Sequence, residues 1–175
     1  MLGIDEVRAI AEAAHAGVTD KIGDPYINHV VAVAEGVKPF GIDKLEMAAL
    51  LHDVVEDTGW TESLLLRVGV PSQVVRTVMT VTNQNGVPYQ EKIRLITDDL
   101  DSTRLKISDN AHNSRPDRLA RITDQATRHR LHLKYLKARD QLWLAASPED
   151  IRMIIEIVNP DLISELDGRM ELGQF

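Results

Sequence analysis

Residues 47–57 read MAALLHDVVED and form the most informative stretch of the chain. Four polar residues stand in it: His52, Asp53, Glu56 and Asp57. On an α-helix at about 100° per residue, these side chains fall within an arc of roughly 140°, and the apolar side chains occupy the opposite arc. Like charges at that spacing repel one another, and burying them without partners is costly. A bound divalent cation would remove both problems, whereas a solvated acidic face would leave the histidine unexplained.

The composition indicates one acidic domain without cysteine. Hydrophobic residues make up 43% of the 175 residues and aromatic residues only 4%, so aliphatic side chains must form the core. The chain has 20 Lys and Arg residues against 27 Asp and Glu residues, and the resulting net charge of −7 argues against nucleic-acid binding. The lack of cysteine restricts any metal site to nitrogen and oxygen ligands.

The start of the chain does not resemble a signal peptide, and the sequence contains no long apolar run. We therefore expect a cytoplasmic protein that does not bind membranes. The sequence leaves open whether the chain forms a homo-oligomer.

Hydrophobic periodicity and helix-capping residues predict an all-α fold in a single domain. The expected helices span about residues 4–16, 25–38, 43–57, 61–69, 71–82, 88–97, 102–114 and 124–145, with another beginning at Ser147. Asp24 is the expected cap of the second helix, and Pro116 should prevent the helix before it from continuing. Residues 83–86 are expected to form a turn, and no stretch alternates convincingly with the period of a strand.

Two further residues are candidates for a metal site. His29 stands among the core-facing residues of its helix, and Asp109 shares one side of the helix at 102–114 with Lys106 and Asn113. Taken alone, His29 would be an ordinary core histidine, and Asp109 would be an acid paired with Lys106. His29 and Asp109 are therefore candidate ligands only in combination with His52 and Asp53.

That set resembles the HD-domain metal-dependent phosphohydrolases. In this superfamily, a His on one helix, a His-Asp pair on a second and an Asp on a third bind one divalent ion. The matching positions are His29, His52, Asp53 and Asp109. The surrounding sequence is similar to the hydrolase domain of RelA/SpoT proteins and to small single-domain guanosine 3′,5′-bispyrophosphate hydrolase-like proteins. The similar segments are AHAG (14–17), KIGDPYINH (21–29), AALLHDVVEDT (48–58) and LKISDNAHN (105–113).

The resemblance implies a fold and an activity. It implies an HD-domain helical bundle, which we expect over residues 1–146. Residues 147–175 lie outside the resemblance, and we expect them to pack on the same domain as a C-terminal helical extension. It also implies that a metal-activated water, usually with Mn²⁺, removes the 3′-pyrophosphate of the anionic nucleotide (p)ppGpp.

The resemblance further implies roles for individual residues. Glu56 and Asp57 match the catalytic acidic pair, Lys21 matches a contact to substrate phosphate, and Asn113 matches a hydrogen bond to the nucleotide. Each role has an alternative. Glu56 and Asp57 could be an acidic helix end, Lys21 a solvated loop lysine, and Asn113 a helix C-cap.

Four positions depart from the pattern of many RelA/SpoT proteins. They are Asp20, where an Arg often helps to hold guanine, Val18 in place of Gln, Val30 in place of Pro, and Pro116 in place of a nucleotide-contacting Thr. None of them is a metal ligand or belongs to the acidic pair, so the hydrolytic chemistry is better supported than the guanine specificity. The alternatives are an HD phosphohydrolase for another nucleotide or phosphoester, and a non-catalytic nucleotide-binding module.

Overall fold

Helices make up the regular secondary structure of the chain. The computed structural model describes residues 2–83 and 86–175, and within these ranges it contains no β-strand, only an isolated bridge between Thr19 and Pro25. The predicted all-α class is therefore confirmed. The helices are α1 (Ile4–Ala14), α2 (Tyr26–Val37), α3 (Asp43–Leu51), α4 (Val54–Asp57), α5 (Glu62–Arg67), α6 (Ser72–Val81), α7 (Tyr89–Ile96), α8 (Leu100–Asn113), α9 (Pro116–Ala120), α10 (Gln125–Trp143), α11 (Pro148–Val158) and α12 (Ile163–Glu171). Over the same ranges, no helix combines the length and the apolar character needed to cross a membrane.

Side-chain caps and a proline set several helix boundaries. Four residues accept a hydrogen bond from a backbone N–H in the first turn of the helix that follows them: Thr61, Asp99, Asp124 and Ser147. Pro116 begins α9, and α8 ends before it as predicted.

The start of α2 corrects one prediction. Pro25 itself is the N-cap residue, and the carboxylate of Asp24 pairs with Arg121 instead of capping the helix. The turn expected at residues 83–86 includes residues 84 and 85, which lie outside the described ranges.

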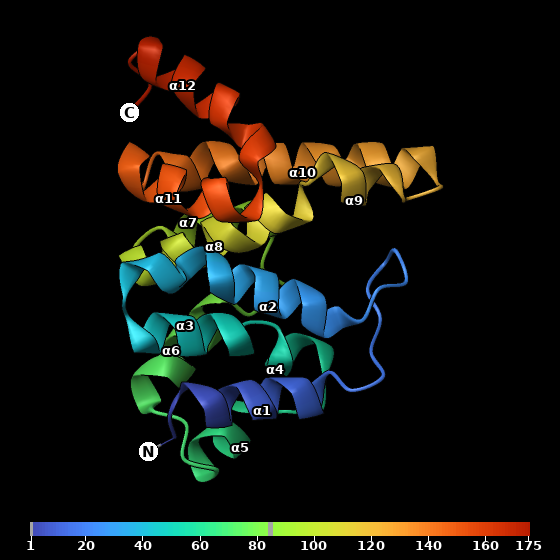
Figure 1. Cartoon of the computed structure of the whole chain (residues 1–175), viewed down its shortest axis with the longest axis vertical. Coiled ribbons are helices and arrows are strands. Elements are labelled where there is room, and N and C mark those ends of the chain that lie inside the picture. The colour runs from blue at the N-terminus through green and yellow to red at the C-terminus, as the bar shows by residue number, and fades with distance from the viewer. Residues whose placement is uncertain (1, 84–85) are drawn as a thin grey trace.

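Helix α2 lies at the centre of the bundle. It packs against α3 on one side and against α8 and α11 on the other, and Figure 1 shows these helices as layers between α1 and α12. Apolar residues of α11 belong to the main hydrophobic core, so the predicted extension at 147–175 begins with a helix packed on that core. The division of the chain at residue 147 stays a prediction.

The loop before α2 and the start of α10 lie at the same end of the molecule. Both views show this arrangement, and the ion pair between Asp24 and Arg121 joins the loop to the segment that follows α9. Segments about a hundred residues apart in sequence therefore meet at this end.

A glycine permits the close contact between α2 and α8. A Cβ atom on Gly36 would lie closer than 3.0 Å to side-chain atoms of both Ser108 and Val158. The hydroxyl of Ser108 donates a hydrogen bond to the carbonyl of Val33 at 2.8 Å, which fixes the two helices together. Because Asp109 follows Ser108, this contact also sets the distance between α2 and one of the predicted ligands.

The predicted continuous helix over residues 43–57 is wrong at its centre. Helix α3 ends at Leu51 and α4 begins at Val54, with His52 and Asp53 between them. Asp53 has φ −105° and ψ −1°, which differ from helical values of about −63° and −42°. The apolar pattern continues through the interruption, so periodicity alone gave no sign of it.

Candidate metal centre and active site

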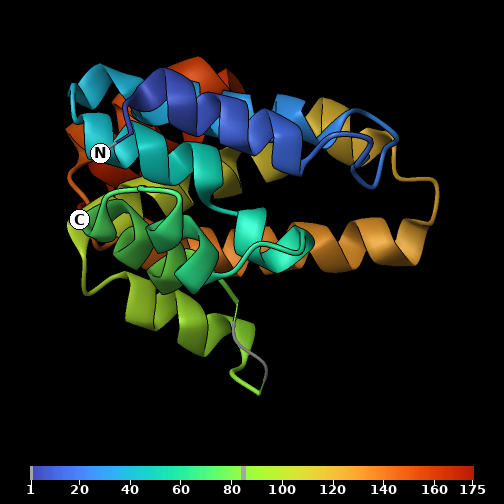
Figure 2. The ribbon, with the colours of Figure 1, turned by 90° about the horizontal axis from the view of Figure 1, so that it is seen from below.

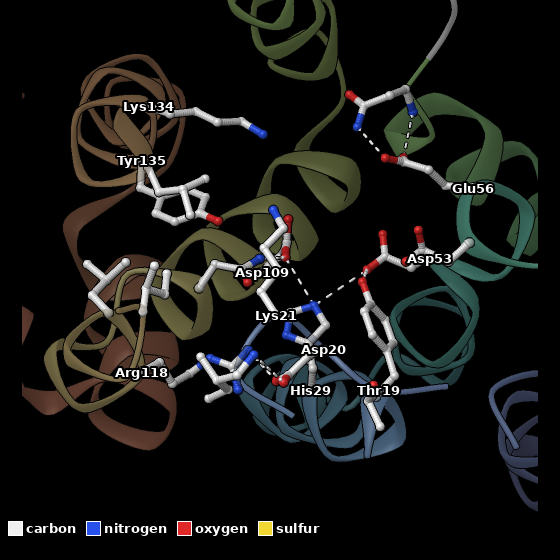
Figure 3. Close-up of a pocket in the computed structure, with 18 of the residues that line it drawn as sticks. Thr19, Asp20, Lys21, His29, Asp53, Glu56, Asp109, Arg118, Lys134 and Tyr135 are labelled. Carbon is white, nitrogen blue, oxygen red and sulfur yellow. Dashed lines mark hydrogen bonds and ion pairs between the residues drawn. The ribbon is translucent and has the colours of Figure 1, made fainter. Parts of the chain in front are cut away.

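Four predicted ligands converge on one point. His29 comes from α2, His52 and Asp53 from the interruption after α3, and Asp109 from α8. Nε2 of His29 lies 3.5 Å from Oδ2 of Asp53 and 3.3 Å from Oδ1 of Asp109. Nε2 of His52 lies 2.9 Å from the same Asp53 oxygen and 3.9 Å from the same Asp109 oxygen. Figure 3 shows Asp53, Asp109 and His29 facing the same pocket.

Both histidines present an unpartnered nitrogen to this point. Among the described residues, Nε2 of His29 and Nε2 of His52 are buried without a hydrogen-bond partner. Nδ1 of His52 lies 2.8 Å from the carbonyl oxygen of Ala49, and only a protonated Nδ1 can donate to that carbonyl. His52 therefore has its proton on Nδ1 and a free lone pair on Nε2, as a metal-binding imidazole requires.

The donor set fits a six-coordinate divalent ion. Atoms bound about 2.1 Å from an ion at right angles to each other are about 3 Å apart, which is close to the spacings observed here. His29, His52 and Asp53 each offer one ligand atom within 4.8 Å of the other two, and Asp109 adds a second carboxylate. Two imidazoles and two carboxylates suit ions of intermediate hardness.

Neighbouring side chains hold the two carboxylates in place. The hydroxyl of Tyr26 donates a hydrogen bond to Oδ2 of Asp53 at 2.7 Å. Lys106 lies 2.6 Å from Oδ2 of Asp109, and the amide of Asn113 donates to Oδ1 of the same residue at 2.6 Å. Asn113 therefore orients the carboxylate of Asp109, a candidate metal ligand. Lys106 forms an ion pair with the same carboxylate, as the simpler interpretation of these two residues predicted.

Buried opposite charges control the titration of the ligands. Burial alone would raise the pKa of Asp53, but His52 and His29 outweigh it and hold that pKa well below its usual value. Burial likewise opposes the charge on Asp109, yet Lys106 and His29 lower its pKa. Both carboxylates are therefore ionised and ready to bind a cation at neutral pH.

A second histidine stands behind His29. Nδ1 of His112 lies 2.8 Å from Nδ1 of His29, so only one of these two atoms carries a proton. Burial and the neighbouring His29 lower the pKa of His112 to about 3, so His112 is neutral and can accept this proton in a hydrogen bond. With its Nδ1 proton held in this way, His29 directs Nε2 toward Asp53 and Asp109, and this nitrogen would bind a metal after losing its own proton.

The acidic pair lies beside the ligands. Glu56 and Asp57 belong to α4 and line the same pocket as Asp53 and Asp109. Asn83 holds Glu56, because its backbone N–H and its side-chain amide donate to the two carboxylate oxygens at 3.0 and 2.7 Å. Burial raises the pKa of Asp57, and the nearby charges of Asp53 and Glu56 raise it further. The two acids thus have different environments.

The pocket places this acidic site opposite several cations. Its volume is about 390 Å³, and Lys21, Lys106, Arg118 and Lys134 line it together with the carboxylates. Figure 3 shows Lys134 and Arg118 on the side of the pocket away from Glu56 and Asp53. A ligand that carries several negative charges and contacts a metal would suit this distribution.

The structure brings the predicted site residues together. The ligands, the acidic pair, Lys21 and Asn113 all line the pocket except His52, which lies just beneath its surface. Sequence reasoning missed Tyr26, Asn83, Arg118 and Lys134. The position of Tyr26 one turn before His29 was a usable signal. The other three depend on contacts between segments that are distant in sequence.

Comparison with known proteins gives consistent matches. The model of the HD domain family matches residues 8–155. The chain is 30% identical to the guanosine-3′,5′-bis(diphosphate) 3′-pyrophosphohydrolase of Haemophilus influenzae, over 86% of this chain and 26% of that protein. It is 29% identical to the bifunctional (p)ppGpp synthase/hydrolase SpoT of Escherichia coli, over 93% of this chain and 28% of that protein. The chain therefore spans about a quarter of the length of these relatives.

One solved structure resembles the chain over nearly its whole length. It is that of a metazoan ortholog of SpoT, described as hydrolysing ppGpp, with a TM-score of 0.70 and 25% sequence identity. The likeness covers 90% of this chain and 94% of the metazoan protein. The arrangement of helices around the pocket is thus similar to that of a protein of comparable size.

Proposed function

Because the chain belongs to the HD domain family, we propose that it is a metal-dependent phosphohydrolase that removes the 3′-pyrophosphate of (p)ppGpp. The observation that carries this proposal is the convergence of two free imidazole nitrogens and two carboxylates beside an acidic pair in one pocket. The described activity of the metazoan relative and the names of the bacterial relatives support the choice of substrate.

We propose that His29, His52, Asp53 and Asp109 hold one divalent ion, with Mn²⁺ as the expected metal. Their nitrogen and oxygen atoms and their spacing suit this ion. A bound ion supplies positive charge that polarises a phosphoryl oxygen and makes water more acidic.

The acidic pair would manage the two proton transfers of the reaction. Hydrolysis joins the oxygen of water to phosphorus, breaks the bond from that phosphorus to the ribose O3′, and leaves a proton on O3′. Glu56, held by Asn83, is placed to accept the proton that water loses. Asp57 has a raised pKa, which suits a group that delivers a proton to O3′. Lys21 and Lys106 would offset the charge of the pyrophosphate.

The direct test is an assay with defined products. The Mn²⁺-loaded protein should convert ppGpp into GDP and pyrophosphate. Glu56→Gln should keep its metal but lose activity by orders of magnitude, whereas Asp53→Ala should lose the metal itself. Full activity of Glu56→Gln would remove this residue from the mechanism. A metal-loaded protein that is inactive on ppGpp but hydrolyses another nucleotide would reject the substrate and keep the enzyme class.

A second candidate keeps the chemistry and changes the substrate to another nucleotide or phosphoester. The observation that favours it is Asp20, a pocket residue at the position where many RelA/SpoT proteins have an Arg that helps to hold guanine. Turnover measured across a panel of nucleotides separates the two candidates.

A further inference from the structure

We infer that Arg118, held in position by Asp20, reads the edge of a purine that carries an oxygen at position 6, and so sets the base specificity of the pocket. This inference rests on the proposed function only in assuming that a nucleotide enters this pocket. It assigns a specificity-determining role to a residue that the sequence alone did not single out.

The ion pair between Asp20 and Arg118 is sheltered and joins distant parts of the chain. Nη2 of Arg118 donates to Oδ2 of Asp20 at 2.9 Å, and only 16% of the Arg118 side chain and 6% of the Asp20 side chain are exposed. Oδ1 of Asp20 accepts hydrogen bonds from the backbone N–H groups of Ile22 and Asp24, each at 3.0 Å. The carboxylate is thus fixed by its own loop, and it fixes the guanidinium in turn.

This arrangement leaves most of the guanidinium available to a ligand. Among the described residues, Asp20 is the sole hydrogen-bond partner of the Arg118 side chain. An arginine side chain carries several further N–H donors in a planar fork. Arg118 also lines the pocket, and Figure 3 shows its guanidinium beside Asp20 at the pocket edge, away from Glu56 and Asp53.

The wall next to Arg118 is apolar. Leu119, Ile122, Leu131 and Tyr135 form a small hydrophobic cluster separate from the main core, and all four line the pocket. Such a wall offers nothing to a phosphate group, but it offers van der Waals contact to the face of a heteroaromatic ring. A guanidinium at the edge of that wall is placed to meet the edge of the same ring.

The chemistry of the guanidinium selects among bases. Paired N–H donors match the two acceptors O6 and N7 of guanine or hypoxanthine, whereas adenine presents a donor amino group at position 6. A phosphate contact would make no such distinction. We therefore expect Arg118 to discriminate between 6-oxopurine and adenine nucleotides, while the charged groups on the other side of the pocket treat them alike.

The test is an NMR titration of the Mg²⁺-loaded full-length protein with GDP, IDP and ADP. The wild type should bind GDP and IDP with similar Kd values and ADP about 5- to 150-fold more weakly, the range expected for one bidentate contact to a base. Arg118→Gln should remove this preference and leave all three Kd values near the wild-type value for ADP. Arg118→Lys, which keeps the charge but not the fork, should retain only part of it.

Arg121→Gln is the matched control. Arg121 also ties this region to the loop before α2, through Asp24, but it is half exposed and does not line the pocket. This variant should keep the full preference for GDP and IDP, which separates loss of the fork from loosening of the loop.

Three results would overturn the inference. The first is a wild-type protein that shows no preference for GDP and IDP over ADP, or that binds none of the three nucleotides. The second is an Arg118→Gln variant that keeps the preference. The third is an Arg118→Gln variant whose affinity falls equally for all three nucleotides. The last result would assign Arg118 to phosphate. Lack of ppGpp hydrolysis together with an Arg118-dependent preference would reject the proposed function and leave this inference standing.

Discussion

Gly36→Ala should destabilise the protein and weaken metal binding at the proposed site. Gly36 lies on α2 where this helix crosses α8 and α11, and an added methyl group would meet Ser108 on one helix and Val158 on the other. Both neighbours belong to packed helices, so neither contact can be relieved by the free end of a flexible side chain. Helix α2 must therefore move away from at least one of them.

The expected cost follows from three contributions. Overpacking a core position costs about 1–3 kcal/mol. Movement of α2 would also weaken the hydrogen bond from Ser108 to the carbonyl of Val33, which is worth about 0.5–1.5 kcal/mol. Alanine regains about 0.5–1 kcal/mol over glycine in a helix. The net effect is a loss of about 0.5–4 kcal/mol in the free energy of unfolding, which corresponds to a Tm lower by about 1–16 °C for a chain of this size.

Urea denaturation of the chelator-treated protein measures this effect, with Gly168→Ala as the control. Gly168 lies in α12, and a Cβ atom there would have nothing within 4 Å. This control should stabilise the protein by about 0.5–1 kcal/mol. Because α2 carries His29 and Asp109 follows Ser108, Gly36→Ala should also raise the Kd for Mn²⁺. A Gly36→Ala variant as stable as Gly168→Ala would refute the proposed packing of α2 against α8.

Two further predictions concern the charges of the site. Burial opposes the charge on His29, but Asp109 and Asp53 raise the pKa of this metal-free histidine to about 9, above the 6.5 of an unfolded histidine. Protonated His29 therefore stabilises the metal-free fold fully below pH 6.5, and this contribution disappears between pH 6.5 and about 9. Calorimetry in buffers of different ionisation enthalpy should detect release of about one proton per ion bound at neutral pH, and no release would contradict this ligand assignment. Asn83→Ala should lower kcat about tenfold with unchanged metal content. It removes the hydrogen bond from the side-chain amide to the charged Glu56, which is worth about 1.5 kcal/mol. An unchanged kcat would show that the backbone N–H of residue 83 is sufficient to hold Glu56.

The sequence was sufficient to predict the all-α class and to select four candidate ligands that the fold brings together. His29, His52, Asp53 and Asp109 could be proposed as a set because their order and the surrounding sequence resemble the HD-domain phosphohydrolases, whereas taken alone His29 and Asp109 have ordinary explanations. The helix ends could be placed where a capping side chain or a proline acts locally, as at Ser147. At these helix ends, the relevant physics operates within a few residues of chain.

The pocket residues that pair with distant segments could not be predicted in this way. Arg118 and Asp20 are separated by 98 positions, and nothing in the local pattern of either segment indicates that they meet. Asn83 follows the end of α6 and reaches Glu56 across 27 positions. Each of these residues has an ordinary local explanation as a surface or turn residue, so only the packing of the helices could reveal its partner.

The prediction of a continuous helix fails between α3 and α4, at two of the candidate metal ligands. On a continuous helix, the side chains of adjacent residues diverge by about 100°. The φ angle of Asp53, −105°, departs from the helical value, and Nε2 of His52 and Oδ2 of Asp53 lie 2.9 Å from each other. The interrupted backbone also leaves the carbonyl of Ala49 to accept the Nδ1 proton of His52, which fixes the tautomer that binds metal. The local departure from helical geometry therefore accompanies the close approach of two candidate ligand atoms from adjacent residues, and the apolar residues on either side keep both helices packed in the core.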